Sequence, residues 1–256
     1  MSPDEMDRAQ WIMSSGKLNL WLTPTSSRVL DLHSETAPDS LTNPLSFASA
    51  SLAFSFAQAT NFPVLSFFCG LQPKQPPGPA TNRTMTLWNS LNAQLLTFII
   101  AHRQTTDLSF LEQPKFLRKS QSKPKYATLL FKELLSSLPD NEMIFIIIDS
   151  FSRFGATAAD FVEGNKLLEE LVRLTKEMPQ LVVKLLVTDA LTSSKIRTLA
   201  ELTIRVPDDV GGWRGGVSVR DLEEKRGVMV GQLVKRRKRI ESDGVEEGSE
   251  GGSGSE

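Results

Sequence analysis

The residues Met143-Ile-Phe-Ile-Ile-Ile-Asp149 form an unbroken apolar run that ends in a carboxylate. A short run of this kind, rich in β-branched side chains, is typical of a strand buried on both faces of a parallel sheet. In open α/β sheets, ligands bind at the carboxyl ends of the strands. The run therefore predicts a central strand that places Asp149 at the ligand-binding edge of an α/β fold.

Three residues form a candidate site for a nucleotide and Mg²⁺. Asp149 ends its strand where nucleotide-hydrolysing folds keep a magnesium-organising aspartate. A second strand, predicted over residues 181–187, ends in Thr188, where related folds place a polar group near the terminal phosphate. Arg153 follows Asp149 closely enough to reach a phosphate. The structural alternatives are an aspartate that caps the next turn and a solvated loop arginine.

Apolar runs alternate with helical spacing along the chain, which predicts β-α-β units and a mostly parallel sheet flanked by helices. Further strands are expected over residues 28–32, 62–69 and 202–206. Helices are expected over residues 8–22, 44–59, 84–103, 107–118, 126–138, 161–178 and 193–200. For the helix at 161–178 we expect Asp160 as the N-cap and Phe161 on the buried face.

The segment between the first strand and the next helix, residues 33–43, lacks the features of a phosphate loop. The pattern G-x-x-x-x-G-K-[ST] does not occur, and the segment contains neither glycine nor lysine. Residues 29–73 contain no Lys or Arg, whereas Asp31, Glu35 and Asp39 are acidic. A carboxylate about 4 Å from a phosphate costs roughly 4 kcal/mol per charge pair at an effective dielectric near 20. The sequence therefore argues against tight nucleotide binding.

Other catalytic chemistry has little support. Gly16-Lys17 is the only GK pair, but it precedes the first strand and has Trp11 where the first glycine would stand. Cys69 is the only cysteine and lies in an apolar run, so we expect a buried structural residue. His33 and His102 have no motif partner, and G-x-S-x-G is absent. We expect no resident metal or cofactor, with ATP and Mg²⁺ disfavoured.

Composition divides the 256 residues into three parts. Residues 8–210 read as one domain, 211–240 as a linker with a basic helix, and 241–256 as a disordered acidic tail. The single cysteine suits an intracellular compartment, nuclear or cytoplasmic. A net charge of −1 gives no bias toward nucleic acid, and no apolar run approaches the roughly 20 residues that span a bilayer. We expect a protein partner, and neither a membrane nor a nucleic acid.

Seven blocks along the chain resemble fungal proteins related to the NACHT/STAND class of signal-transduction ATPases. The blocks include NPLSFASASLAF (43–54), PVLSFFCG (63–70), LWNSLNAQLL (87–96), IFIIIDSFSRF (144–154) and VVKLLVTDAL (182–191). The resemblance implies a P-loop NTPase-like fold in which Asp149 is the Walker B aspartate and Thr188 the sensor position. It also implies that Gln94 belongs to a recurring helix after the second strand. The chain departs from the class at the phosphate loop and lacks its winged-helix and repeat regions.

The functional hypothesis is therefore a non-catalytic interaction or scaffold module on a degenerate NTPase fold. One alternative is a weak ATP- or GTP-binding signalling NTPase, so any enzymatic activity would be that of a nucleoside triphosphatase. The other is a nuclear, nucleic-acid-associated protein that uses the run Lys235, Arg236, Arg237, Lys238 and Arg239.

The same run predicts nuclear localisation, because adjacent exposed cations fit an acidic receptor groove and carry no base-reading geometry. We expect alanine at all five positions to shift a fluorescent fusion from nucleus to cytoplasm. An unchanged distribution would leave the run as the solvated end of a helix.

Overall fold

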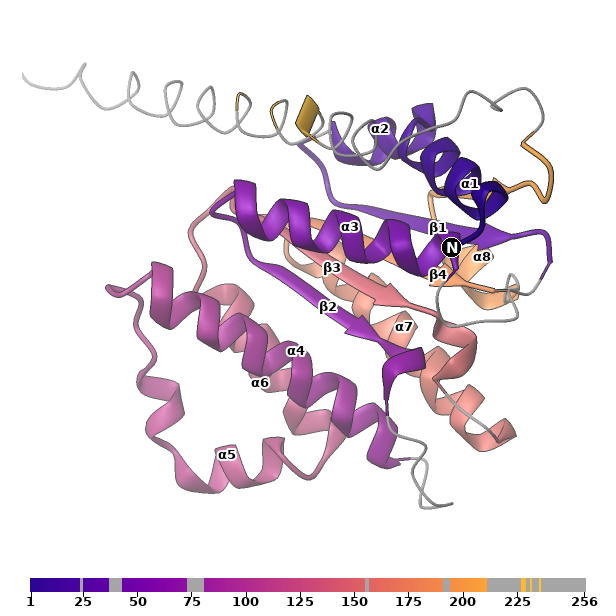
Figure 1. The fold of residues 1–256 in the computed structure, drawn as a ribbon. Coiled ribbons are helices and arrows are strands. Elements are labelled where there is room, and N and C mark those ends of the chain that lie inside the picture. Colours follow the sequence, from indigo (N-terminus) through magenta and orange to yellow (C-terminus); the bar gives the residue numbers. More distant parts are fainter. Residues whose placement is uncertain are drawn as a thin grey trace, which may run out of the picture.

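The computed structural model describes residues 1–23, 25–36, 43–72, 81–154, 157–190 and 194–210, together with 227, 228, 231 and 235. Five strands form one all-parallel sheet in the spatial order β2-β3-β4-β1-β5 (Figure 1). The strands are β1 (Arg28–Ser34), β2 (Val64–Phe68), β3 (Met143–Asp149), β4 (Val182–Asp189) and β5 (Leu202–Val206). The fold is therefore α/β with helices flanking the sheet, as predicted.

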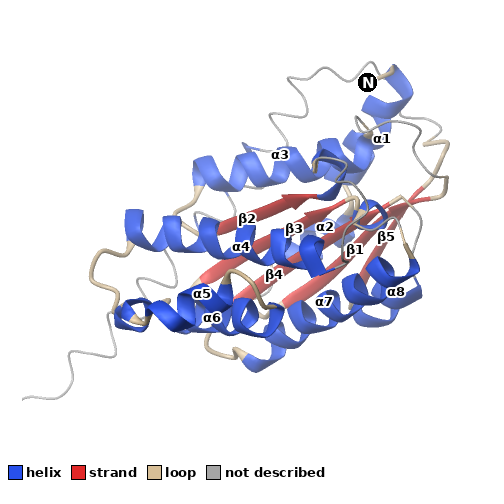
Figure 2. Ribbon diagram, turned by 90° about the horizontal axis from the view of Figure 1, so that it is seen from below, coloured by secondary structure: helices blue, strands red, loops and turns tan. Residues whose placement is uncertain are grey.

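Helices cover both faces of this sheet (Figure 2). The helices are α1 (Pro3–Met13), α2 (Gly16–Leu22), α3 (Pro44–Ala59), α4 (Thr81–His102), α5 (Pro114–Ser120), α6 (Pro124–Ser136), α7 (Ala158–Glu177) and α8 (Ser194–Leu199). The first three pack on one face, and α4, α6, α7 and α8 pack on the other. Helix α5 lies farther out, against α6 (Figure 1). None of the described helices is long and apolar enough to cross a bilayer.

The central position of β3 explains its unbroken apolar sequence. Ile146 and Ile148 belong to the core under α4, α6 and α7, whereas Phe145 and Ile147 belong to the core under α1 to α3. The Phe145 ring stacks on Phe56 of α3, with ring centroids 4.4 Å apart. Because successive side chains of a strand alternate between faces, a strand with two cores needs apolar residues at every position.

The start of α7 differs from the prediction. Thr157, not Asp160, is the N-cap; Asp160 is the third helical residue and completes a capping box with Thr157. Phe161 is 42% exposed, contrary to the expected buried face. The inward position is taken by Gly164, where a Cβ would come within 3.0 Å of the rings of Phe151 and Phe154. The later positions of the predicted face, from Leu168 to Met178, are buried, so only the first turn departs from the expectation.

Other boundaries move by a few residues. The stretch 8–22 forms two helices, because Ser15 caps α2 with its side chain just after α1 ends. Strand β1 continues through His33 to Ser34, so the following loop begins later than expected. In the region after 210, Lys235 is described and exposed, whereas residues 236–256 lie outside the described residues.

The two-core arrangement predicts different effects for the same substitution at two sites. Ile147→Ala in β3, where the side chain is fully buried, should lower the free energy of unfolding by about 2–5 kcal/mol. Ile100→Ala on the exposed side of α4 is the matched control and should change it by about 0.5 kcal/mol or less. Urea denaturation measures both. Similar small losses would contradict the placement of β3 in the core.

Candidate functional site

The candidate site lies where the sheet connections diverge. The chain leaves β1 toward α3 on one face, and it leaves the neighbouring strand β4 toward α8 on the other face. In open α/β sheets this divergence opens a crevice at the carboxyl ends of the strands, where ligands bind. Asp149, Thr188 and Asp189 stand at this edge on β3 and β4, as the sequence predicted for the first two.

Asp149 is held by three hydroxyl groups. Thr188 Oγ1 donates to its Oδ1 at 2.6 Å, and Ser46 Oγ and Ser150 Oγ donate to its Oδ2 at 2.8 and 2.9 Å. The carboxylate is only 2% exposed, and Thr188 is fully buried. A buried carboxylate must have its hydrogen bonds satisfied, since losing them costs the desolvation energy of a charged group. These hydroxyls therefore satisfy both oxygens of the buried side chain.

The turn after β3 is locked into the same network. Ser150 adopts a left-handed conformation with φ of 55°, which is uncommon for a residue other than glycine. Its backbone N–H donates to Thr188 Oγ1 at 3.0 Å, so Thr188 joins the turn to Asp149. The N–H of Ser152 donates to Asp189 Oδ1 at 3.0 Å. Both carboxylates thus hold the chain that follows β3, which is the structural role considered for Asp149 in the sequence.

The amino end of α3 is the place where a phosphate would meet backbone amides. Here Asn43 is the N-cap, and its Oδ1 accepts from the N–H groups of both Leu45 and Ser46 at 3.0 Å. The asparagine side chain therefore occupies two of the amides that would otherwise face an anion. The helix end is satisfied from within the protein.

The hydrogen bond from Ser46 to Asp149 shows how this helix relates to a phosphate loop. In P-loop NTPases the loop's Ser/Thr and the Walker B aspartate together hold Mg²⁺. If Ser46 is that Ser/Thr, then Pro44 replaces the second glycine and Leu45 the lysine of G-x-x-x-x-G-K-[ST]. Leu45 is only 3% exposed, packed in the core. The serine and the aspartate contact each other directly, and no cation stands at the position that a lysine would take.

The sequence analysis missed Ser46, although a signal existed: it is the third residue of the helix that follows the first strand. Ser46 Oγ donates to Asp149 Oδ2 at 2.8 Å, which adds a hydroxyl from α3 to the strand-end residues that the sequence identified. Among the described residues, no group of three His, Cys, Asp or Glu side chains is arranged to hold a metal ion.

A pocket of about 620 Å³ opens beside Asp149. Its polar part consists of Ser46, Asp149 and Ser150, and the rest of its wall is largely apolar. The other lining residues are Met1, Met6 of α1, Phe47 and Ala50 of α3, Phe68 of β2, and Gly70 and Leu71 after it. The volume suits a small ligand or an inserted side chain. The lining is unlike a triphosphate site, which needs cations.

The remaining candidates take structural positions. Arg153 is half-buried at the end of a short 3-10 turn, and within the described chain no hydrogen bond or ion pair joins it to Asp149 or Thr188. Lys17 of the GK pair donates to the backbone oxygen of Thr203 in β5 at 2.7 Å, which ties α2 to the sheet. The side chain of Lys17 therefore does not serve as the lysine of a phosphate loop.

Cys69 is buried, as expected. Burial raises the pKa of its thiol far above the ordinary range, and the negative charges of Asp149 and Asp189 raise it further. The thiolate that nucleophilic chemistry requires is therefore strongly disfavoured at neutral pH.

Two features of the neighbourhood were not foreseen. His33 Nδ1 lies 3.2 Å from Asp31 Oδ2, and both side chains are buried on β1. Their i, i+2 spacing places them on one face of the strand, which the sequence could have indicated. Gln94 of α4 pairs its amide with the backbone N–H and C=O of Ser66, both at 2.9 Å. Gln94 thus satisfies backbone groups on the edge strand β2.

No protein-family model matches this sequence, and no curated protein does. Among solved structures, the chain is similar to the ORC2 protein of Aeropyrum pernix, determined as ADPNP-ADP complexes, with a TM-score of 0.41 and 14% identity. The match covers 86% of this chain and 50% of that one, so this chain spans about half the length of that protein.

The hydroxyl network predicts the cost of neutralising Asp149. We expect Asp149→Asn to destabilise the protein by about 1–3 kcal/mol, because the amide NH₂ cannot accept a bond that a hydroxyl now donates. The same substitution at an aspartate without such contacts should cost about 1 kcal/mol or less. Asp140→Asn, at an exposed turn position, is the matched control and should be silent in urea denaturation. Equal effects would show that the network contributes nothing.

Proposed function

We propose that this chain is a non-catalytic interaction or scaffold module built on a degenerate NTPase fold. The observation that carries the proposal is the buried Leu45, which stands where a phosphate loop would place its lysine. The side chain of Asn43 also occupies the N–H groups of Leu45 and Ser46, which would otherwise face a phosphate. Catalysis of phosphoryl transfer depends on the charges that are missing there.

Electrostatics at the strand ends supports the same proposal. Asp149 and Asp189 are buried at this edge, and residues 29–73, which include α3 and the loop before it, contain no Lys or Arg. A triphosphate would approach carboxylates without the cations that normally offset its charge. An ATP- or GTP-binding signalling NTPase is therefore the weaker alternative.

The apolar pocket supports an interaction role. Its methionine and phenylalanine side chains can adapt to an apolar side chain of a partner protein, since methionine is flexible and polarisable. A place among the degenerate relatives of fungal NACHT/STAND proteins, without Mg²⁺ or ATP as cofactors, is part of this proposal. Whether the protein is nuclear or cytoplasmic is tested by the alanine variant of the run at 235–239, described above.

The test is isothermal titration calorimetry of the full chain with ATP and Mg²⁺. We expect a dissociation constant weaker than about 100 μM, or no measurable heat. The proposal fails if binding is tighter than about 10 μM, is lost in Asp149→Ala and is kept in Asp140→Ala. Asp140 is the matched control because it carries the same charge at an exposed position. Melting temperatures of both variants identify any loss caused by unfolding.

A further inference from the structure

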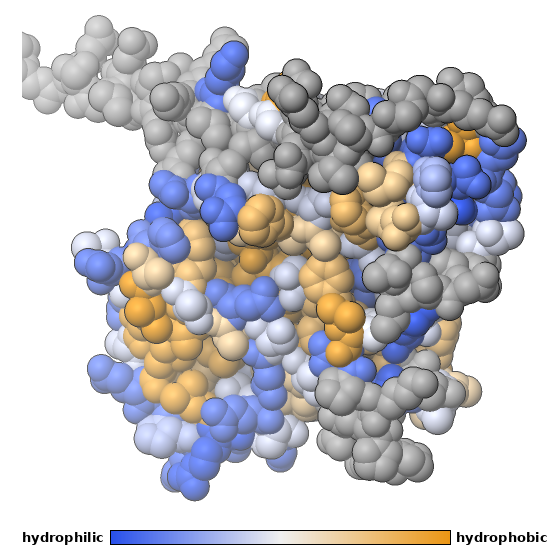
Figure 3. Space-filling view, viewed as in Figure 1, coloured by the Kyte–Doolittle hydropathy of each residue, from blue (hydrophilic) through white to orange (hydrophobic). Residues whose placement is uncertain are grey.

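The stretch that forms α5 and the beginning of α6 has a one-sided charge. Residues 113–132 contain six Lys or Arg residues and no Asp or Glu. Five of the six cations are exposed: Lys115, Arg118, Lys119, Lys123 and Lys125. We call these five side chains the basic surface. In Figure 1 helix α5 lies at the lower edge of the molecule, away from the carboxyl ends of the strands, and Figure 3 shows hydrophilic side chains gathered along that edge.

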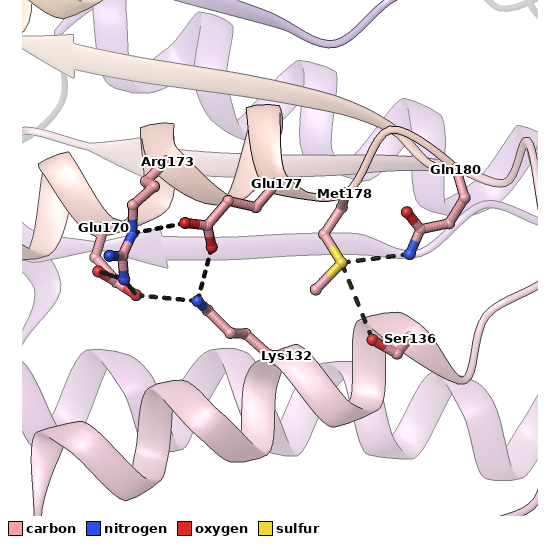
Figure 4. A network of polar contacts seen from close by, with 7 residues as sticks. All are labelled: Lys132, Ser136, Glu170, Arg173, Glu177, Met178 and Gln180. Carbon is pink, nitrogen blue, oxygen red and sulfur yellow. Dashed lines mark hydrogen bonds and ion pairs between the residues drawn. The ribbon is translucent and has the colours of Figure 1, made fainter.

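The cations of the basic surface differ from those between α6 and α7. No ion pair joins any of the five to a carboxylate within the described chain. In contrast, Lys132 lies 3.7 Å from Glu170 and 2.8 Å from Glu177, and Arg173 pairs with the same two carboxylates (Figure 4). The basic surface therefore keeps its positive potential, whereas the charges between α6 and α7 cancel.

The backbone holds these cations in a fixed arrangement. Lys115, Arg118 and Lys119 are spaced i, i+3 and i+4 on α5, which puts them on one side of the helix. The turn to α6 is closed by hydrogen bonds from the N–H groups of Gln121 to Leu117 and of Lys123 to Lys119. Lys123 is the N-cap residue of α6. A binding partner would thus meet charges that are already positioned.

The apolar groups nearby restrict the type of partner. Phe116 and Tyr126 are half-buried and pack edge to face with ring centroids 6.5 Å apart. Lys119 Nζ lies over the Tyr126 ring at 5.0 Å from its centroid and covers that face. Neither of these two rings is therefore open for stacking on an unpaired base. Such stacking is the contact that proteins use to recognise single strands. The one exposed large apolar side chain of the stretch 113–132, Leu129, lines a pocket together with Glu163 and Glu170. These carboxylates would repel an acidic peptide that inserted an apolar anchor there.

We propose that the basic surface binds the phosphate backbone of a double-stranded nucleic acid without reading its sequence. A duplex backbone supplies a dense, regular array of negative charge, which lysine and arginine contact as positioning groups. The whole chain has a net charge of only −1, although cations are concentrated on this surface. The proposal goes beyond the interaction module proposed above and does not rest on it, because the strand-end site is elsewhere.

The experiment measures fluorescence anisotropy of a short labelled DNA duplex with the full chain, over a series of salt concentrations. The test variant carries Lys115→Gln, Arg118→Gln and Lys123→Gln. The matched control carries Lys176→Gln, Arg197→Gln and Arg205→Gln, which removes the same charge from exposed positions on α7, α8 and β5. Each of the two variants is made twice, once with the native run 235–239 and once with that run changed to alanine. The contributions of the two basic segments to binding are then measured separately.

In both backgrounds, we expect the test variant to bind the duplex at least about tenfold more weakly than the control at low salt. The slope of log K against log salt should be smaller in magnitude by about 2–3, close to 0.9 per lost phosphate contact. Melting temperatures of the two variants should agree.

Three results would overturn the proposal. Equal duplex affinity of the two variants would mean that the basic surface takes no part. Tighter binding of the matching single strand would contradict recognition of a duplex. A stronger, surface-dependent affinity for phosphatidylserine vesicles or for a synthetic peptide of residues 241–256 would assign the surface to a membrane or an acidic segment. None of these results bears on ATP binding, which is measured separately.

Discussion

Burial of β3 and β4 on both faces is the constraint on which the rest of the structure depends. Every residue of these two strands is buried, and each strand contributes alternate side chains to two separate cores. A parallel sheet can meet this requirement only if helices cover both of its faces. The covering helices then bring the strand ends, the amino end of α3 and the turn after β3 together at one edge. The position of Asp149 is a consequence of this packing.

At that edge, the protein satisfies a buried carboxylate with neutral donors. Lys184, the buried cation of β4, is directed elsewhere: its Nζ donates to the backbone oxygen of Ser26 at 2.9 Å. Asp149 relies instead on the hydroxyls of Ser46, Ser150 and Thr188. In a nucleotide hydrolase the equivalent oxygens take part in holding Mg²⁺. Here these side chains tie α3, β3 and β4 together.

Charge is distributed unevenly over the molecule, and its local balance matters more than the total. The α6–α7 junction pairs its cations with Glu170 and Glu177, while α5 leaves its cations unpaired within the described chain. The strand-end site is acidic and apolar. A phosphate group is therefore disfavoured at the position where the fold would hold a nucleotide and favoured on the opposite part of the surface.

The sequence by itself determined the α/β class, the five strands and most helices, because apolar runs and helical spacing report burial directly. It also identified Asp149 and Thr188 as strand-end residues and the absence of a phosphate-loop lysine. The tertiary structure decided what those residues contact. Ser46 is 103 positions from Asp149, and only the packing of α3 on the sheet brings their side chains within hydrogen-bonding distance. The exposure of Phe161 was likewise beyond periodicity, since Gly164 takes the place against the rings of Phe151 and Phe154.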